Sequence, residues 1–306
     1  MALFVEDSFS LSPNIKTDLG IRFLKNYFTN ENLLSPRLNI LFILNEKNVF
    51  NFRTGVYYQP PFFTELTGLI DDPYKLKSQR AIHFSIGWKN QLKEKVTMNW
   101  EVFYKKLDYL IPFYYEDLKM ISVKGNVNEG YSFGFDVMFQ GEISNGIESW
   151  LGYSYLDSKE REMNSNEPYR RRLLDQTHTF QIFLQDHFRK YPNWQSHLRL
   201  LAGSGFLYNI RKLVKNEQTN TYETVVDLDN PQVYTLYLRA DMGLSATFDV
   251  SEKSRLVFTT EVLNVFNQYN YGGYDWIRVF NNSQGLKNIP KILSKRFFNL
   301  KVEYYF

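Results

Sequence analysis

The residues that could catalyse a reaction are few and scattered in this sequence of 306 residues. Its histidines, His83, His178, His187 and His197, are spread along the chain, and there is no cysteine. Asp186 precedes His187 and suggests an acid–base pair, but neighbouring residues of a strand point to opposite faces. The sequence also has no Gly-x-Ser-x-Gly elbow, phosphate-binding glycine loop or His-Glu-x-x-His motif. We therefore expect a protein that is not an enzyme and that holds neither a metal ion nor another cofactor.

Aromatic side chains are better candidates, because they could contact a ligand. One group lies in the stretch YNYGGYDWIRVF near the C-terminus and comprises Tyr269, Tyr271, Tyr274 and Trp276. Rings on a loop can stack on a sugar or an aromatic iron chelator, although they can also pack on one another or on neighbouring loops. A second group, at the end of a predicted strand, consists of Tyr57, Tyr58 and Gln59. We expect both groups to be candidate ligand-binding residues.

Two polar clusters have both a functional and a structural interpretation. The basic cluster consists of Arg170, Arg171 and Arg172. It could receive an anionic ligand or the phosphates of lipopolysaccharide, or it could be a solvated loop. The amide cluster consists of Asn264, Asn267 and Asn270. Because asparagine suits turns, we favour a structural role for the amide cluster over ligand contact.

The elements that must position these groups are β-strands, because apolar and polar residues alternate along most of the chain. From Tyr234 to Asp249, for example, every second residue is apolar, whereas the residues between them are mostly polar. Comparable alternation recurs at 15–23, 38–44, 50–58, 82–88, 96–104, 131–140, 147–155, 180–184, 196–202, 256–262 and 298–306. The sequence therefore predicts an all-β protein with roughly thirteen long antiparallel strands.

The connections between these strands alternate strictly between short and long. The short ones are SLSP, NEK, NQLKE, GEISN, FRKYPN and VSEKS. The long ones lie near 24–34, 59–78, 110–129, 158–174, 204–233 and 265–291. Each repeat is thus a hairpin in an up-and-down sheet, without a second domain or linker.

Alternation alone fits both a soluble β-sandwich and a transmembrane β-barrel, which place their apolar faces inside and outside respectively. The predicted strands approach the length of about 9–11 residues that a tilted strand needs to cross a bilayer. Short and long connections also alternate as in outer-membrane barrels. Trp88 and Trp194 flank short turns, whereas Tyr58, Tyr104 and Tyr155 lie at the far ends of strands. This placement is typical of two interfacial aromatic girdles and favours the barrel.

The positions of the charges support the same interpretation. A cation facing lipid at the bilayer midplane costs about 2–4 kcal/mol, so lipid-facing positions should lack charges. The alternating apolar faces carry none, and we expect four charged residues to face the lumen, paired with one another or with a plug domain: Arg239, Asp241, Arg255 and Glu261.

Composition excludes other classes of protein. A formal net charge of +3, without a basic patch, argues against nucleic-acid binding. No apolar run reaches the length of about 18 residues that indicates a transmembrane helix. The first residues, MALFVEDSFS, lack the features of a signal peptide and read as the middle of a strand.

Several motifs occur together in a consistent order along the chain. They are DQTHTFQIFLQDHF from Asp175, LLAGSGF from Leu200, LRADMGLSATF from Leu238, EVLNVFNQYNY from Glu261 and the terminal IPKILSKRFFNLKVEYYF. Upstream, LSPRLNI and FRTGVYYQPP look like earlier strands of the same barrel. This series resembles the TonB-dependent outer-membrane receptors over essentially the whole chain.

The resemblance implies an antiparallel transmembrane β-barrel in the outer membrane of a Gram-negative bacterium, with short periplasmic turns and long extracellular loops. Its parent protein is expected to import a scarce nutrient of the ferric siderophore, cobalamin or oligosaccharide class. The implied partners are outer-membrane lipid and lipopolysaccharide, the barrel assembly machinery, the TonB complex and a small extracellular ligand. A passive porin-like barrel, and less so an outer-membrane enzyme, stay open as alternatives.

The last strand carries a further expectation. Its apolar face consists of Phe298, Leu300, Val302, Tyr304 and Phe306. The resemblance implies that the assembly machinery recognises the terminal aromatic residue and that this strand closes the barrel against the first.

The number of strands departs from the family pattern. Single-chain bacterial barrels have even strand numbers, and plugged transporters have about 22 strands. We therefore expect residues 1–306 to be the C-terminal part of a receptor barrel, without its plug domain or signal peptide.

Overall fold

A computed structural model describes most of the chain. The described residues are 1–66, 76–116, 119–122, 125–144, 147–173, 175–218, 220–279 and 285–306. Residues 67–75 of the connection expected at 59–78 and the last residue of the expected short connection GEISN lie outside them. Among the described residues, no helix is long and apolar enough to cross a membrane.

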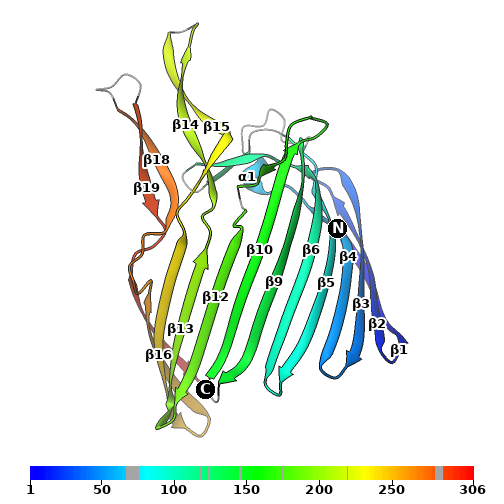
Figure 1. The fold of residues 1–306 in the computed structure, drawn as a ribbon, viewed down its shortest axis with the longest axis vertical. Coiled ribbons are helices and arrows are strands. Elements are labelled where there is room, and N and C mark those ends of the chain that lie inside the picture. The colour runs from blue at the N-terminus through cyan, green and yellow to red at the C-terminus, as the bar shows by residue number, and fades with distance from the viewer. Residues whose placement is uncertain are drawn as a thin grey trace.

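One large antiparallel sheet dominates the described structure, as the prediction of an all-β, up-and-down fold requires (Figure 1). It has 14 strands, of which only β11 (Arg170–Arg171) lies off the main path. The main path runs through β1 (Ala2–Ser12), β2 (Ile15–Asn26), β3 (Glu31–Asn45), β4 (Asn48–Gln59), β5 (Gln79–Lys93), β6 (Val96–Leu110), β9 (Asn128–Ser144), β10 (Ile147–Glu162), β12 (His178–Phe188), β13 (Tyr191–Gly203), β16 (Tyr237–Ser251), β17 (Ser254–Leu263) and β20 (Phe297–Tyr305).

The two ends of the sheet differ in the way that the sequence predicts. At the turn end, short connections join successive strands, for example at Ser12–Ile15 and Asn45–Asn48. The other end, here called the hairpin end, carries the longer connections. Three of these fold into hairpins of their own: β7 (Phe113–Glu116) with β8 (Lys119–Ser122), β14 (Leu207–Asn216) with β15 (Thr221–Val233), and β18 (Tyr271–Val279) with β19 (Gly285–Ile292). A one-turn helix, α1 (Phe63–Leu66), also lies there (Figure 1).

The expected long connection at 24–34 was wrong. Strands β2 and β3 pair as far as Asn26 and Glu31, so that only a tight turn joins them. The Asn26 side chain accepts a hydrogen bond from the Phe28 backbone N–H at 3.0 Å, and Asn30 has a positive φ of 51°. These local features of asparagine close the turn without further residues.

The sheet has one apolar and one polar face, and the apolar face is the exposed one. On β20, Phe298 and Leu300 have exposed fractions of 72% and 73%. Cross-strand neighbours on the same face, such as Phe258 on β17 and Met242 on β16, are also exposed. A soluble sandwich buries its apolar face, so this arrangement favours the barrel.

The polar face is the concave side of the sheet. Arg53 on β4 reaches across β5 to Glu101 on β6, with their charged atoms 3.2 Å apart. His197 on β13 reaches across β16 to Glu261 on β17, with Nε2 and Oε1 3.1 Å apart. Side chains two strands apart converge in this way only on the inside of a curved sheet. This face is called the lumen face below.

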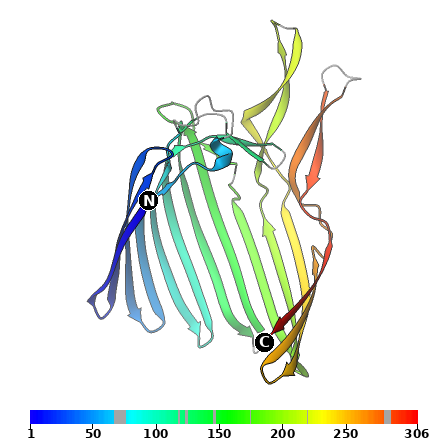
Figure 2. The same ribbon diagram turned by 180° about the vertical axis from the view of Figure 1, so that it is seen from behind.

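The edges of the sheet are formed by β1 and β20. Within the described residues β1 pairs only with β2 and β20 only with β17 (Figure 2). Within the part of the chain that the structure describes, the two edge strands therefore do not pair with each other.

Candidate ligand-binding site at the hairpin end

Two long hairpins, β14–β15 and β18–β19, project beyond the sheet (Figure 1). They contact each other, since β14 lies against β19. The Arg278 guanidinium on β18 also donates a hydrogen bond of 2.6 Å to the backbone carbonyl of Tyr222 on β15. Segments that are about 60 residues apart in sequence thereby form one unit.

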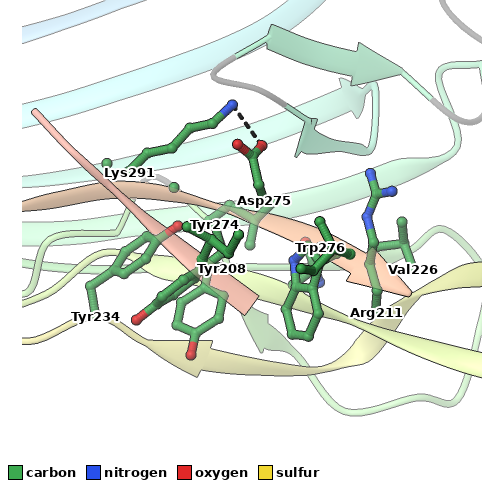
Figure 3. A pocket seen from close by; sticks show the side chains of 14 residues that line it. Tyr208, Arg211, Val226, Tyr234, Tyr274, Asp275, Trp276 and Lys291 are labelled. Carbon is green, nitrogen blue, oxygen red and sulfur yellow. Dashed lines mark ion pairs between the residues drawn. The ribbon is translucent and has the colours of Figure 1, made fainter. Parts of the chain in front are cut away.

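A cavity of about 320 Å³ lies between these hairpins (Figure 3). Its most prominent feature is a stack of Tyr208, Tyr234 and Tyr274. The ring centroids are 4.3 Å apart for Tyr208–Tyr234, 4.9 Å for Tyr208–Tyr274 and 5.5 Å for Tyr234–Tyr274. Trp276 meets Tyr274 edge-on at 6.5 Å and also lines the cavity. Such rings offer flat apolar surfaces to a ring of a ligand.

Polar groups give the cavity a specific chemistry. The Asn209 amide donates a hydrogen bond of 2.9 Å to the Asp227 carbonyl, whereas its buried Oδ1 has no partner within the described residues. Asp275 and Lys291 also line the cavity and form an ion pair of 2.7 Å (Figure 3). A buried acceptor without a partner is costly, so a ligand that donates a hydroxyl or N–H group to Asn209 would be favoured. The cavity thus suits a ring that carries hydrogen-bond donors.

Burial raises the pKa of both Tyr234 and Tyr274, and the neighbouring tyrosines add to the effect. Desolvation disfavours the phenolate, so these hydroxyls stay protonated at neutral pH. They can therefore act as hydrogen-bond donors in the cavity.

We expect the two hairpins to loosen in alkaline solution because of Tyr234. Its pKa in the folded protein lies above the ordinary value of 10.0, so its contribution to stability is intact below pH 10 and is lost as pH rises further. Proteolysis of the hairpins should accelerate above pH 10, and Tyr234→Phe, which cannot ionise, should reduce that acceleration. Equal pH profiles for the two proteins would contradict this assignment.

The amide cluster ties the β18–β19 hairpin to the sheet. Asn264 is completely buried and has a positive φ of 52°. Its Nδ2 donates to the carbonyls of Gln268 at 2.9 Å and Ser294 at 3.2 Å, and its Oδ1 accepts from the Gln268 N–H at 2.9 Å. Its own N–H donates to Asp241 on β16 at 2.9 Å. These bonds fix both ends of the segment that carries the hairpin.

The other two asparagines extend this connection. Asn267 Oδ1 accepts a hydrogen bond of 2.9 Å from the Arg296 backbone N–H, just before β20. Asn270 exchanges two hydrogen bonds with the Leu238 backbone at the start of β16, at 2.8 and 2.9 Å. The geometry agrees with the structural role that the sequence favours for the cluster.

The lumen face below the cavity carries paired charges. Asp241, whose exposed fraction is 3%, forms an ion pair with Arg239, in which Oδ1 and Nε are 2.7 Å apart. Glu261 contacts His197 and also accepts a hydrogen bond of 2.9 Å from Asn299. The His197 ring lies over Gly243, where any larger residue would collide with the ring.

Comparison with known proteins assigns the fold. The sequence profile of the family described as "TonB dependent receptor-like, beta-barrel" matches residues 1–267. The chain belongs to this family of TonB-dependent receptor barrels. None of the curated proteins matches the sequence.

Solved structures of TonB-dependent receptors superpose on nearly the whole chain. The outer membrane transporter YddB from Escherichia coli has a TM-score of 0.69 at 14% identity, and the alignment covers 99% of this chain and 44% of YddB. The ferric-catecholate import receptor Fiu from E. coli has a TM-score of 0.64 at 15% identity, with the same two coverages. A variant of the ferric enterobactin receptor PfeA from Pseudomonas aeruginosa has a TM-score of 0.65 at 14% identity, again with those coverages. The chain thus spans less than half the length of these proteins, and at such low identity the likeness establishes the fold alone.

The structure separates the aromatic residues that the sequence singled out in this TonB-dependent receptor barrel. Tyr274 and Trp276 line the cavity, and Tyr271 stacks on Tyr274 at 6.3 Å. Tyr269 is exposed and lies outside the residues that line the cavity. The group at the end of β4 is remote from the cavity and is itself split, because Tyr57 faces the lumen whereas Tyr58 shares a face with Val56 and Ile82.

Each arginine of the basic cluster lies beside a carboxylate. Arg170 pairs with Glu167 at 2.6 Å. Arg171 pairs with the fully buried Asp175 at 3.3 Å, and Arg172 pairs with Glu160 at 2.8 Å. Backbone pairing holds β11 against β10, and the Arg172–Glu160 pair adds to this contact. Together the three ion pairs reduce the positive charge available to an anionic ligand.

The remaining residues that the sequence singled out in the receptor barrel lie in the large sheet or beside its turns, away from the cavity. The apolar residues Phe298, Leu300, Val302 and Tyr304 lie on the exposed face of β20, and Phe306, which follows the strand, is exposed as well. On the lumen face, Arg255 lies over the Tyr305 ring at 4.6 Å. Asp186 and His187 do not bond with each other, since His187 contacts the Pro192 carbonyl and Gln195. No group of potential ligands for a metal ion occurs among the residues that the structure describes.

Sequence reasoning missed half of the cavity, namely the contribution of Tyr208, Asn209 and Tyr234. The region 204–233 was taken as one long connection, yet Leu207–Asn216 and Thr221–Val233 are rich in residues that favour strands. A polar turn between them, Asn216 to Asn220, is the signal that could have predicted this hairpin.

Proposed function

We propose that this chain forms part of the wall of an outer-membrane receptor, in which it captures a scarce nutrient for TonB-energised uptake. The observation that carries this proposal is the division of one sheet into an exposed apolar face and a charged lumen face, with an aromatic cavity at one end. The apolar face suits lipid contact, and the lumen face suits a water-filled passage.

In this proposal the hairpin end is extracellular and the turn end is periplasmic. The cavity then opens where a ligand first meets the cell. The lipid and lipopolysaccharide of the outer membrane surround the barrel, and the assembly machinery and the TonB complex are its protein partners. Two of the similar structures are named as receptors for ferric catecholate and ferric enterobactin, so ferric siderophores are the first ligand class to test.

Uptake by the bacterium that carries this gene tests the proposal. We expect deletion of the gene to abolish growth on one member of a panel of ferric siderophores, cobalamin and oligosaccharides. Loss of TonB should have the same effect, whereas a passive porin-like barrel would continue to admit the nutrient without TonB. Unchanged growth on every member of the panel would contradict the proposal.

Trp276→Ala tests the cavity itself. An aromatic contact contributes about 0.5–1.5 kcal/mol beyond area burial, so the substitution is expected to weaken ligand binding by about 2- to 13-fold. Tyr269→Ala, which removes an exposed ring outside the cavity, is the control and should leave binding unchanged. Equal effects of the two substitutions would show that the ligand binds elsewhere.

A further inference from the structure

A hollow of about 630 Å³ lies in the lumen face at the turn end of β6, β9, β10 and β12, far from the tyrosine cavity between β14–β15 and β18–β19 (Figure 1). Gly141 of β9 lines this hollow. Its φ is 127°, and any Cβ there would collide with the Lys95 carbonyl oxygen, so only glycine fits. The small side chain of Ser149 lies opposite Gly141 on β10. The wall therefore recedes at this point, and the hollow has the size of a small-molecule site.

Trp150 gives the hollow a flat apolar surface. The Phe183 ring stacks on Trp150 with the two centroids 5.7 Å apart and the planes 22° from parallel, and His197 continues the stack at 6.1 Å from Phe183. Phe183 thus covers one side of the Trp150 indole. The other side turns toward β9, where Gln140 is the register partner of Trp150 and also lines the hollow. A ring-shaped ligand with an apolar face can stack on this free side of the indole.

Four polar side chains that line the hollow have no hydrogen-bond or ion-pair partner within the part of the chain that the structure describes: Thr97, Gln140, Glu148 and Gln185. Gln140 lies between Thr97 and Trp150 in one row across the strands. Glu148 and Gln185 are register partners in the next row toward the turns. The amides and the hydroxyl can both donate and accept hydrogen bonds, whereas the carboxylate only accepts. The hollow therefore offers both kinds of partner to a ligand that is rich in hydroxyl groups.

The charges of the hollow disfavour an anion. Lys95 is its only cation among the described residues, and it already forms an ion pair with Glu142. Glu148 adds a second carboxylate. Two carboxylates thus accompany one cation, an excess of negative charge that repels carboxylate and phosphate groups. A neutral ligand meets no such repulsion and can be held by the indole and the uncharged amides.

We propose that this hollow binds a neutral sugar residue of an oligosaccharide. The apolar face of the sugar ring stacks on Trp150, and its hydroxyl groups exchange hydrogen bonds with Gln140 and Gln185. A sugar fits because it combines an apolar ring face with hydroxyls that both donate and accept. The site is separate from the tyrosine cavity. Its use as a second contact along the path of an imported oligosaccharide rests on the proposed function, whereas sugar binding itself does not.

Saturation-transfer NMR on the purified protein tests for sugar binding. The detergent is lauryldimethylamine oxide, because alkyl glucosides and maltosides would themselves present sugars to the hollow. The probes are the neutral trisaccharides maltotriose, cellotriose, mannotriose and α-linked galactotriose, together with trigalacturonate, the anionic C6-oxidised form of that galactotriose. At least one neutral probe should bind, equally well at low and high salt, whereas at low salt trigalacturonate should bind at least tenfold more weakly than the best neutral probe. If no neutral probe binds, or if trigalacturonate binds as tightly as the best of them, the proposal is wrong.

Substitutions of the two glutamines place the sugar in the hollow. The double variant Q140A/Q185A should weaken binding of the best neutral probe at least tenfold. The control is Gln195→Ala, which removes a glutamine of the lumen face outside the hollow and should leave binding within about twofold of the wild type. Unchanged binding to a folded Q140A/Q185A protein would overturn the proposal, because the sugar would then lie elsewhere, for example in the tyrosine cavity.

The indole is tested separately. Trp150→Ala should weaken binding at least tenfold, and Trp150→Phe, which keeps a flat ring, should restore most of the affinity. If the double glutamine variant does not fold, equal binding by Trp150→Ala and the wild-type protein would overturn the proposal instead. These assays need neither cells nor TonB, so that their failure and the failure of the uptake experiment are distinguishable.

Discussion

Trypsin should cleave the β18–β19 hairpin at least tenfold faster after Asn264→Ala than in the wild-type protein. The substitution removes the Asn264 side chain from the carbonyls of Gln268 and Ser294 and from the Gln268 N–H. A buried polar group left without a partner costs about 1–3 kcal/mol, and an alanine at positive φ adds about 1 kcal/mol. We expect a total loss of about 2–4 kcal/mol, expressed locally because the strands of the large sheet keep their own hydrogen bonds.

The control for this prediction is Asn288→Ala, which changes an exposed asparagine of the same hairpin. Its cleavage rate should match that of the wild-type protein. Asn264→Asp should be intermediate, because a carboxylate keeps the acceptor for Gln268 but loses the donor for the two carbonyls. If Asn264→Ala and Asn288→Ala were cleaved equally fast, the amide cluster would not anchor the hairpin.

Phe258→Arg is expected to destabilise the protein in a lipid bilayer by about 2–4 kcal/mol. Phe258 lies in the middle of β17 on the exposed apolar face, opposite Val302 of β20. A cation there must leave water for hydrocarbon or drag water into the bilayer. The free energy of unfolding, measured by denaturant titration in lipid vesicles, reports the difference.

Val257→Arg is the matched control because Val257 is the next residue of the strand and faces the lumen, opposite Glu303. A cation at that position stays in water and gains a nearby carboxylate. Its effect should be below about 1 kcal/mol, as for exposed charges generally. A loss for Val257→Arg as large as that for Phe258→Arg would exclude the assignment of the two faces.

The strands could be predicted because their alternation is long and uninterrupted. The terminal strand shows this best, because every second residue from Phe298 to Phe306 is apolar. In the structure, β20 pairs with β17 so that these apolar residues lie opposite apolar residues such as Phe258. Membership of the TonB-dependent receptor family was likewise confirmed by the match over residues 1–267.

The positions at which strands end were predicted less accurately than the strands themselves, for a physical reason. Tyr104 and Tyr155 were taken as strand ends because polar residues follow them, yet β6 continues to Leu110 and β10 to Glu162. A strand that rises above a bilayer has water on both faces and needs no alternation, so its sequence no longer distinguishes it from a loop. Hydrogen bonding to the neighbouring strand keeps it regular.

The cavity could only be half predicted because it is built from two hairpins. Tyr274 and Trp276 stand out in a glycine-containing aromatic stretch, but their partners Tyr208 and Tyr234 lie about 40 to 70 residues earlier. No local pattern indicates that these segments meet.

The central claim is that the apolar face of this sheet contacts lipid while the opposite face contacts water. Because the chain has no cysteine, single cysteines can be placed at Leu300, Lys301, Val302 and Glu303 and labelled with a nitroxide in vesicles. We predict that apolar oxygen relaxes the labels at 300 and 302, whereas a water-soluble nickel chelate relaxes those at 301 and 303. Equal access of the nickel chelate to all four positions would contradict a membrane-spanning barrel wall.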